Sequence, residues 1–216
     1  MKIGILGTGI VGQTIANRLV HLTHDVMLGS RSASNAAAST WAASHRGHAA
    51  HGTFAEAATF GDVVFNCTAG AQSIDALYLA EAGTTLRGKI LMDISNPLDF
   101  SKGMPPTLTV CNTDSVGESI QRAFPDVRVV KTLNTVNCEV MVQPSKVTGP
   151  HTMFLCGNDA PAKARVTDYL KTWFRWGDIL DLGDITAARG MEMLVIPWVR
   201  IMQTLGHANF NWHVQR

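Results

Sequence analysis

The sequence predicts an α/β fold built on a doubly wound, mostly parallel sheet, with a short helical extension at its C-terminus. Two observations indicate this fold class. Apolar runs alternate with helical segments, which favours a parallel sheet covered by helices. These runs are residues 2–7, 25–29, 62–67, 89–94, 127–131, 152–156 and 178–182. Residues 62–67 and 89–94 are almost continuously apolar, which is typical of central strands buried on both faces.

Length and composition narrow the class of protein. The chain has 216 residues, 46% of them hydrophobic, which suits one full core but not two complete domains. Its formal charge of +1 favours neither nucleic acid nor a membrane surface as a partner, so we expect a small molecule. The sequence shows neither a signal-peptide pattern nor an apolar run of transmembrane length, and we expect a cytoplasmic protein.

A glycine-rich turn joins the first predicted strand to the first predicted helix. Gly7, Gly9 and Gly12 follow an apolar run and precede a helical pattern over residues 15–22. At this spacing Gly7 permits the turn, Gly9 lets the backbone approach a pyrophosphate, and Gly12 allows the helix to pack closely on the strand. Because the helix N-terminus also offers amides to an anion, the pattern predicts the dinucleotide-binding turn of a Rossmann fold.

The residues after the second strand indicate which dinucleotide binds. An NAD-binding protein carries Asp or Glu there, roughly 20 residues past the turn, to bind the ribose 2'-hydroxyl. Here the sequence reads Gly29-Ser30-Arg31-Ser32. A guanidinium and two hydroxyls can surround a 2'-phosphate with charge-assisted hydrogen bonds, whereas a carboxylate would repel it. These residues therefore predict NADP(H) as the cofactor.

The ends of later strands carry residues suited to the same ligand. Thr68 and Ala69 are small and allow close approach of the backbone. Asn96 and Pro97 follow the next strand, and Asn96 can offer a donor and an acceptor to a bound ring or carboxamide. An ordinary Asn-Pro turn is an equal alternative there. The same two alternatives apply to residues 134–137 at the end of the fifth strand.

Neither a metal site nor a catalytic side chain is predicted. His45, His48 and His51 could share one helical face, but Gly47 and Gly52 interrupt that helix and no acidic or cysteine ligand accompanies the histidines. The two tyrosines lack a lysine four residues later, which the short-chain dehydrogenases require. No Ser-His-Asp set or pair of catalytic carboxylates stands out either.

The alternation of strand-like and helical runs gives way to a long helical pattern after residue 183. We therefore divide the chain into a nucleotide-binding domain at residues 1–183 and a helical segment at residues 184–216. Asp184 suits a helix N-cap, and Pro197 is expected to kink or divide the helix. We expect the segment to form a homodimer interface or to wall the acceptor pocket, with packing on its own sheet as the alternative. Its apolar residues exceed what one face of a surface helix needs: Met191, Met193, Leu194, Val195, Ile196, Trp198, Val199, Ile201 and Met202.

Six ordered segments span nearly the whole chain and together carry a resemblance to a known family. They are Ile5-Leu-Gly-Thr-Gly9, Leu28-Gly-Ser-Arg31, Asp93-Ile-Ser-Asn-Pro97, Val129-Val-Lys-Thr-Leu-Asn-Thr135, Cys156-Gly-Asn-Asp159 and Asp181-Leu-Gly-Asp-Ile-Thr-Ala-Ala-Arg189. The chain resembles the NADPH-dependent reductases typified by the coenzyme F420:NADP oxidoreductase. The resemblance implies three groups of cofactor-binding residues: Thr8, Gly9, Ile10 and Val11 for the pyrophosphate; Ser30, Arg31 and Asn35 for the 2'-phosphate; and Thr68, Ala69 and Asn96 for the ribose and nicotinamide.

The resemblance implies transfer of a hydride between nicotinamide C4 and a planar acceptor such as coenzyme F420 or a flavin. The family also includes bacterial members with other acceptors and the cytoplasmic reductase domains of membrane metalloreductases. The glycine turn alone also fits pyrroline-5-carboxylate reductases, so imine reduction is the alternative. A third hypothesis, motivated by the apolar C-terminal segment, is a non-catalytic module that binds or senses NADPH. Residues 191–213, rich in Met, Trp and His, depart from the archetype.

Overall fold

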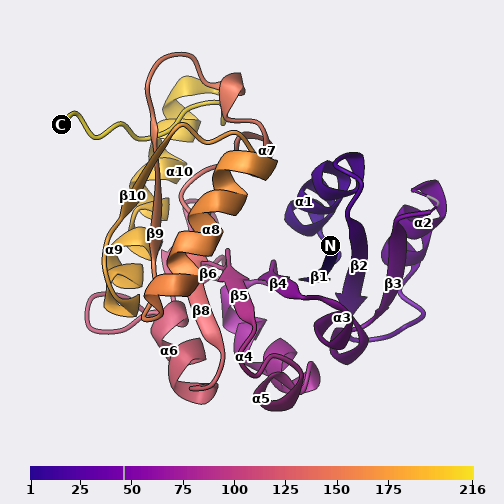
Figure 1. Cartoon of the computed structure of the whole chain (residues 1–216). Coiled ribbons are helices and arrows are strands. Elements are labelled where there is room, and N and C mark those ends of the chain that lie inside the picture. The colour runs from indigo at the N-terminus through magenta and orange to yellow at the C-terminus, as the bar shows by residue number, and fades with distance from the viewer. Residues whose placement is uncertain (46) are drawn as a thin grey trace.

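The computed structural model describes residues 1–45 and 47–216, and its centre is one large sheet (Figure 1). The strands of this sheet are β1 (Lys2–Leu6), β2 (Asp25–Ser30), β3 (Ala49–Thr53), β4 (Val63–Asn66), β5 (Ile90–Asp93), β8 (Arg128–Thr132), β9 (Thr152–Cys156) and β10 (Asp178–Asp181). A separate hairpin consists of β6 (Leu98–Asp99) and β7 (Thr107–Leu108). Every predicted apolar run forms a strand, and the mostly parallel α/β fold is confirmed.

The strand order locates the place where such a fold binds ligands. Within the described residues the sheet has eight strands in the order β10-β9-β8-β5-β4-β1-β2-β3. From β1 the chain moves outward to β2 and β3, and then returns to the other side of β1 with β4, β5 and β8. The switch between β1 and β4 opens a crevice at the carboxyl ends of the strands, where doubly wound sheets hold their ligands.

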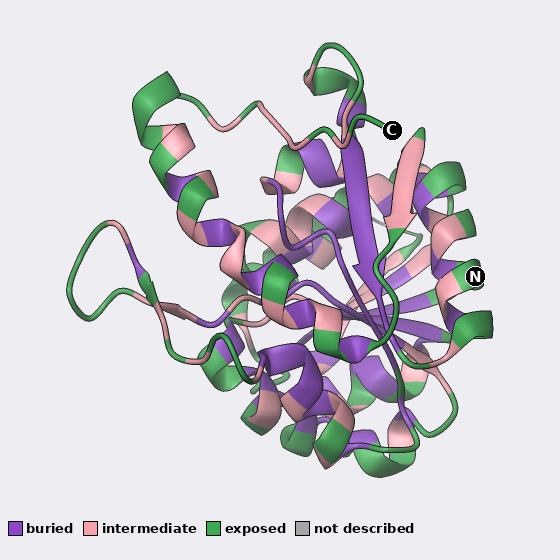
Figure 2. Ribbon diagram, turned by 90° about the vertical axis from the view of Figure 1, so that its left-hand side faces the viewer, coloured by how far each residue is buried: buried purple, intermediate pink, exposed green. Residues whose placement is uncertain are grey.

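Helices cover both faces of the sheet (Figures 1 and 2). One core cluster contains residues of α1 (Ile10–His21), α2 (Ala36–Ser44), α7 (Cys138–Val142) and α8 (Ala160–Trp173). The other contains residues of α3 (Phe54–Phe60), α4 (Gly70–Leu79), α5 (Ala82–Thr85), α6 (Val116–Ala123) and α9 (Ala188–Met193). The side chains of β4 alternate between the two clusters, as expected of a strand with helices on both sides.

Three features of the sheet are not predicted from the sequence. Residues 49–53 read Ala-Ala-His-Gly-Thr, without a β-branched run, yet they form β3 at the sheet edge by pairing with β2. The hairpin strands β6 and β7 have only two residues each, too short for a recognisable period. The chain also reverses direction between β8 and β9, so that β9 pairs antiparallel to β8.

The C-terminal segment is divided close to Pro197. It forms the short 3-10 helix η2 (Ile185–Ala187), then α9, then α10 (Val195–Leu205). Asp184 caps η2, because its side chain accepts from Thr186 N at 2.9 Å. The break falls at Leu194, because Pro197 has no N–H to donate to the carbonyl of Met193 and its ring crowds that carbonyl.

The expectation of a helical segment over residues 184–216 holds only as far as Leu205. The remaining residues form a tail without helix that returns to the sheet. Thr152 N donates to Trp212 O at 2.8 Å at the start of β9, and Arg216 pairs with Asp178. The tail is long enough to reach the sheet edge, and those hydrogen bonds replace the ones that further helix would make.

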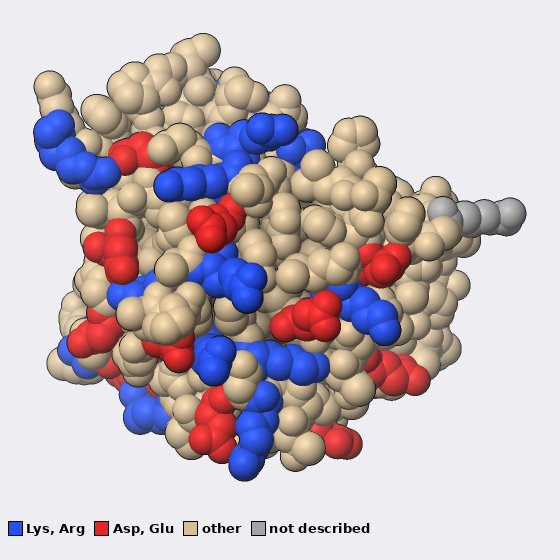
Figure 3. All heavy atoms as spheres, viewed as in Figure 1, with Lys and Arg blue, Asp and Glu red and all other residues tan. Residues whose placement is uncertain are grey.

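On the face drawn in Figure 3, acidic and basic side chains are interspersed. Among the described residues, no helix has both the length and the apolar character that a bilayer crossing requires.

Candidate functional site

The three glycines of the turn after β1 have different roles. The fold requires Gly7 and Gly12, whereas Gly9 leaves open space. Gly7 has φ +122°, and its amide donates to Gly29 O at 3.0 Å. A Cβ at Gly12 would lie 2.3 Å from Gly7 O, so α1 packs too closely there for a side chain. A Cβ at Gly9 would meet no atom of the described residues within 4 Å. The space beside Gly9 is therefore open to a ligand.

The start of α1 adds an electrostatic preference to this space. Gly9 is the N-cap residue and makes no side-chain capping bond, and the first turn contains no acidic residue. Gln13 Nε2 donates to Thr8 O at 2.8 Å and braces the turn. The amides and the positive end of the helix dipole favour an anion such as a phosphate at this position.

The turn after β2 holds one free positive charge. Ser30 is buried and its Oγ donates to Ser32 O at 2.5 Å, while Asn35 caps α2 by accepting from Ala38 N at 2.9 Å. Arg31 is exposed and makes no ion pair with any residue that the structure describes. Ser30 and Asn35 therefore shape the turn, and the Arg31 guanidinium is the group available to an anion.

A cavity of about 650 Å³ occupies the crevice at the switch point. Of the predicted cofactor-binding residues, six line it together: Gly9, Ile10, Val11, Thr68, Ala69 and Asn96. Gly7, Thr8, Gly12 and the buried Pro97 lie outside its lining, and Ser30, Arg31, Ser32 and Asn35 form the separate turn after β2. The remaining wall residues are Cys67, Ala71, Gln72, Ile94, Ser95, Leu98, Phe100, Asn134, Val136, Asn137, Cys138, Met141, Val195 and Trp198.

The wall of this cavity offers almost no acid–base chemistry. Cys67 and Cys138 are the titratable residues among its described lining residues. Burial, with a smaller contribution from Asp93, raises the pKa of the Cys67 thiol, which is therefore neutral at physiological pH. The cavity can hold and orient a ligand, but its wall lacks a carboxyl, imidazole, phenol or ammonium group to donate a proton.

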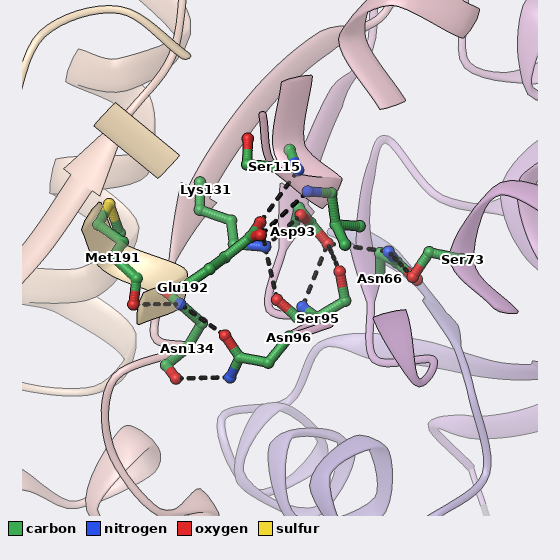
Figure 4. Close-up of polar contacts among 12 residues, drawn as sticks. Asn66, Ser73, Asp93, Ser95, Asn96, Ser115, Lys131, Asn134, Met191 and Glu192 are labelled. Carbon is green, nitrogen blue, oxygen red and sulfur yellow. Dashed lines mark hydrogen bonds and ion pairs between the residues drawn. The ribbon is translucent and has the colours of Figure 1, made fainter. Parts of the chain in front are cut away.

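A row of buried polar side chains lies behind the cavity (Figure 4). Asn66, Asp93 and Lys131 occupy directly paired positions on β4, β5 and β8. Asn66 Nδ2 donates to Asp93 Oδ1 at 2.8 Å, and Lys131 Nζ donates to Asp93 Oδ2 at 2.8 Å. Thr68 Oγ1, at the cavity wall, donates to Asn66 Oδ1 at 2.6 Å. The row thus fixes the ends of three central strands and the residue that lines the cavity above them.

Glu192 of α9 connects the C-terminal segment to this row. Its Oε1 lies 2.7 Å from Lys131 Nζ, and its two oxygens accept from the amides of Val116 and Gly117 at 3.0 and 3.1 Å. Burial disfavours the charge on Lys131, but the carboxylates of Asp93 and Glu192 outweigh it and raise the pKa of the ammonium. The lysine therefore stays charged and joins β5, β8 and α9.

An amide pair joins the same elements at the cavity wall (Figure 4). Asn96 Nδ2 donates to Asn134 O at 2.8 Å, and Asn134 Nδ2 donates to Asn96 Oδ1 at 2.9 Å. Asn134 Nδ2 also donates to Met191 O in α9 at 3.1 Å. The position of α9 is therefore coupled to the loop that carries Asn96.

The start of α10 completes the wall opposite the glycine turn. Val195 and Trp198 line the cavity, and the indole of Trp198 stacks on Phe210 of the tail with ring centroids 5.3 Å apart. The tail of the same chain thus covers part of the apolar surface that the sequence left without a partner.

The three histidines have separate environments. His45 stacks on Trp41, His48 Nδ1 lies 2.8 Å from Asp25 Oδ1, and His51 is on β3. In residues 1–45 and 47–216 there is no group of three or more His, Cys, Asp or Glu side chains arranged to hold a metal ion.

Comparison with known proteins identifies the family. Residues 2–97 match the sequence profile described as "NADP oxidoreductase coenzyme F420-dependent". A solved structure from Arthrobacter sp. FB24, provisionally named an F420-dependent NADP-reductase, is 50% identical, with full coverage of both chains and a TM-score of 0.94. The chain belongs to this family of NADP-dependent oxidoreductases.

The chain is also similar to two more distant proteins. The metalloreductase STEAP3 of Rattus norvegicus is 28% identical over 194 residues, which cover 89% of the chain. The chain spans only 36% of the length of that relative. An imine reductase from Myxococcus stipitatus, solved in complex with NADP+, is 15% identical with a TM-score of 0.64, covering 95% of this chain and 64% of its own. That likeness shows a shared fold.

The residues of this chain fit NADP(H) for two structural reasons. The open space beside Gly9 meets an uncapped helix N-terminus, and a free guanidinium stands after β2 where an NAD-binding protein carries a carboxylate. Sequence reasoning missed Asn66, Asp93, Lys131 and Glu192 as supports of the site. A signal existed, because three neighbouring apolar strands each carry a polar residue near the carboxyl end.

Proposed function

We propose that this protein binds NADPH at the glycine turn and transfers a hydride to a planar acceptor of the deazaflavin or flavin type. One observation carries the proposal. A single cavity extends from the glycine turn to an apolar wall, and its described lining contains no side chain suited to donate a proton. NADPH, when bound, supplies the hydride from nicotinamide C4.

The residues of the turn and the crevice divide the task of holding the cofactor. The amides at Gly9, Ile10 and Val11 receive the pyrophosphate, and Arg31 receives the 2'-phosphate. Thr68, Ala69 and Asn96 also line the cavity, and we assign them to the ribose and nicotinamide end of the cofactor. This assignment follows the path of the cavity from β1 across β4 to β5.

The chain's contribution to the reaction is positioning. Leu98 and Phe100, Val195 and Trp198 offer apolar surface on which a flat ring can lie next to the nicotinamide. A deazaflavin or flavin ring spreads the incoming charge over its own atoms, so close approach and orientation can provide most of the acceleration. Reduction of an imine would instead favour a carboxyl, imidazole, phenol or ammonium group as proton donor, and the described lining contains none of these.

The test is a screen of NADPH oxidation by the purified protein with coenzyme F420, FMN, FAD, ferric chelates and cyclic imines. We expect turnover with F420 or a flavin and none in a Gly9→Val variant used as the control. Turnover with cyclic imines alone would identify an imine reductase. NADPH binding without turnover of any acceptor would identify a binding or sensing module.

We also propose that two copies pair through the C-terminal segment, as a C2 dimer. Val199 is buried, but Ile196, Ile201 and Met202 of α10 are only half-buried, and Leu205 is 49% exposed. The helix that leads into the C-terminal tail stands out from the body (Figure 2). A second copy of the same helix would cover this apolar face symmetrically.

The cytoplasmic location expected from the sequence stays a prediction.

Sedimentation of the wild-type protein tests the pairing. We expect a dimer at tens of micromolar, and Trp198→Glu should shift it towards monomer or aggregate and impair acceptor reduction while NADPH affinity changes little. A wild-type monomer with Trp198 open to a fluorescence quencher would overturn the pairing and leave α10 as an internal wall.

A further inference from the structure

Asn134 lies in the wall of the cavity and carries an unpaired hydrogen-bond acceptor. The residue is 3% exposed and lies two positions after the last residue of β8. Its Nδ2 donates to Asn96 Oδ1 and Met191 O. Its Oδ1 is buried and has no hydrogen-bond partner among the residues that the structure describes. A buried carbonyl left unpaired is unfavourable, and a hydrogen-bond donor on a bound ligand would satisfy it.

The two asparagine amides can adopt only one arrangement. Asn96 Nδ2 faces the main-chain carbonyl of Asn134, and Asn134 Nδ2 faces the main-chain carbonyl of Met191 (Figure 4). Main-chain carbonyls can only accept hydrogen bonds. If the Asn134 amide were reversed, its oxygen would face two acceptors. The atom that remains unpaired is therefore an acceptor, and it selects an N–H or O–H donor.

The backbone before Asn134 is held in an unusual conformation. Leu133 has φ +63°, which residues other than glycine rarely adopt, and its side chain is fully buried. Such a conformation persists where the surrounding structure requires it. Here it turns the chain out of β8, and the next residue enters the cavity wall.

The position of Asn134 points to the nicotinamide end of the cofactor. β8 is three places from β1 in the sheet, and neighbouring strands are about 4.8 Å apart, so Asn134 lies on the order of 14 Å across the sheet from the glycine turn. Adenine and its ribose belong to the opposite side, next to Arg31 after β2. The N–H donor of a nicotinamide ring is its carboxamide. We infer that Asn134 Oδ1 accepts a hydrogen bond from that carboxamide.

This contact makes Asn134 a positioning residue. Holding the carboxamide prevents the ring from turning over about its glycosidic bond, so one face of nicotinamide C4 is presented to Val195 and Trp198. Because the same amide is bonded to Met191 in α9, the orientation of the ring is coupled to the C-terminal segment that walls the cavity. The inference rests on the proposed cofactor.

The test compares binding of NADP+ with binding of its 3-acetylpyridine analogue, in which a methyl group replaces the carboxamide NH2. Calorimetric titration of the wild type should show the analogue binding about tenfold more weakly. In Asn134→Leu, NADP+ should bind about tenfold more weakly and the analogue about as in the wild type, so that the two affinities become similar. No acceptor or turnover is needed.

Thr135→Val is the matched control. Its hydroxyl is also buried and unpaired among the described residues, but Thr135 lies outside the cavity lining, so the tenfold preference should persist. If Asn134→Leu does not fold, Asn134→Ser removes the same oxygen with a smaller side chain. Normal binding of NADP+ without preference in the wild type, or an unchanged preference in the Asn134 variant, would overturn the inference. Failure of the wild type to bind NADP+ at all would overturn the proposed function instead.

Discussion

Gly9–Val11 of the glycine turn and Val195 and Trp198 of the C-terminal segment line one cavity. The glycine turn at residues 7–12 and the C-terminal wall at residues 188–198 are held in place differently. The turn is held mainly by residues near it in the sequence, as in the Gln13 to Thr8 hydrogen bond, together with the hydrogen bond from Gly7 N to Gly29 O of β2. The wall is held by partners far away in the sequence. Glu192 accepts from the amide of Val116, 76 residues earlier, and Met191 accepts from Asn134, 57 residues earlier.

This difference shows which kind of change damages which half of the site. A substitution at Gly9 meets no described protein atom, so we expect it to weaken cofactor binding and to leave the core intact. A substitution in the buried row between Asn66 and Glu192 removes the support of the wall and weakens the fold at the same time. We therefore expect changes at Gly9 to reduce cofactor affinity and changes in the buried row to reduce protein stability.

The largest expected effect is that of Gly9→Val. The new side chain meets no described protein atom but occupies the space assigned to the pyrophosphate, so NADPH binding should be undetectable at about 1 mM while the protein stays folded. Gly12→Val is the contrast, because its Cβ would lie 2.3 Å from Gly7 O and should destabilise the fold. Calorimetric titration and thermal unfolding measure both. Wild-type NADPH affinity in Gly9→Val would mean that the turn has no role in binding.

Lys131→Met should produce the largest loss of stability. It leaves the buried carboxylates of Asp93 and Glu192 without their cation, and breaking such a pair costs about 3–5 kcal/mol. Lys146→Met removes an ion pair with the exposed Glu139 and should cost less than about 1 kcal/mol. Urea unfolding followed by circular dichroism compares them. Equal effects for the two variants would show that the buried row does not hold the wall.

Arg31→Ala tests the part of the site that we assign to the 2'-phosphate of the cofactor. Loss of charge-assisted hydrogen bonds to the 2'-phosphate should weaken NADPH binding by about 10-fold to 100-fold. NADH lacks that phosphate, so its affinity should change only a few fold. Titration with both cofactors measures the two affinities. Equal losses of affinity for NADPH and NADH would contradict the assignment of Arg31 to the 2'-phosphate.

The smallest expected effect is on the pH dependence of protein stability, through an ion pair that holds α9 against α6. Arg189 of α9 forms two hydrogen bonds with Glu118 of α6, at 2.6 and 2.9 Å, and these lower the pKa of the Glu118 carboxyl below its ordinary 4.5. A lowered folded-state pKa contributes stability above about pH 4.5 that is lost as the pH falls through the folded value. Glu118→Gln should therefore lower the melting temperature by a few degrees at pH 6 and flatten its fall below pH 4.5. An unchanged slope in acid would contradict this.

Much of the fold could be predicted because its signals are local. Apolar runs such as residues 62–67 and the glycine spacing each depend on a few consecutive residues. The strand β3 escaped prediction because its small residues acquire strand conformation only by pairing with β2. Trp198 was expected to need a covering surface, and the tail that covers part of it through Phe210 has no periodic pattern to reveal it.

The sequence by itself determined the fold class, the glycine turn and the presence of Arg31 after the second strand, because each rests on spacing along the chain. Only the tertiary structure decided which residues support the site and how the wall is formed. Lys131 meets Glu192, and Asn134 meets Asn96 and Met191, only after the sheet has brought distant segments together. The direction of the buried amide of Asn134, with its oxygen left unpaired, depends on three such segments at once and has no counterpart in the linear sequence.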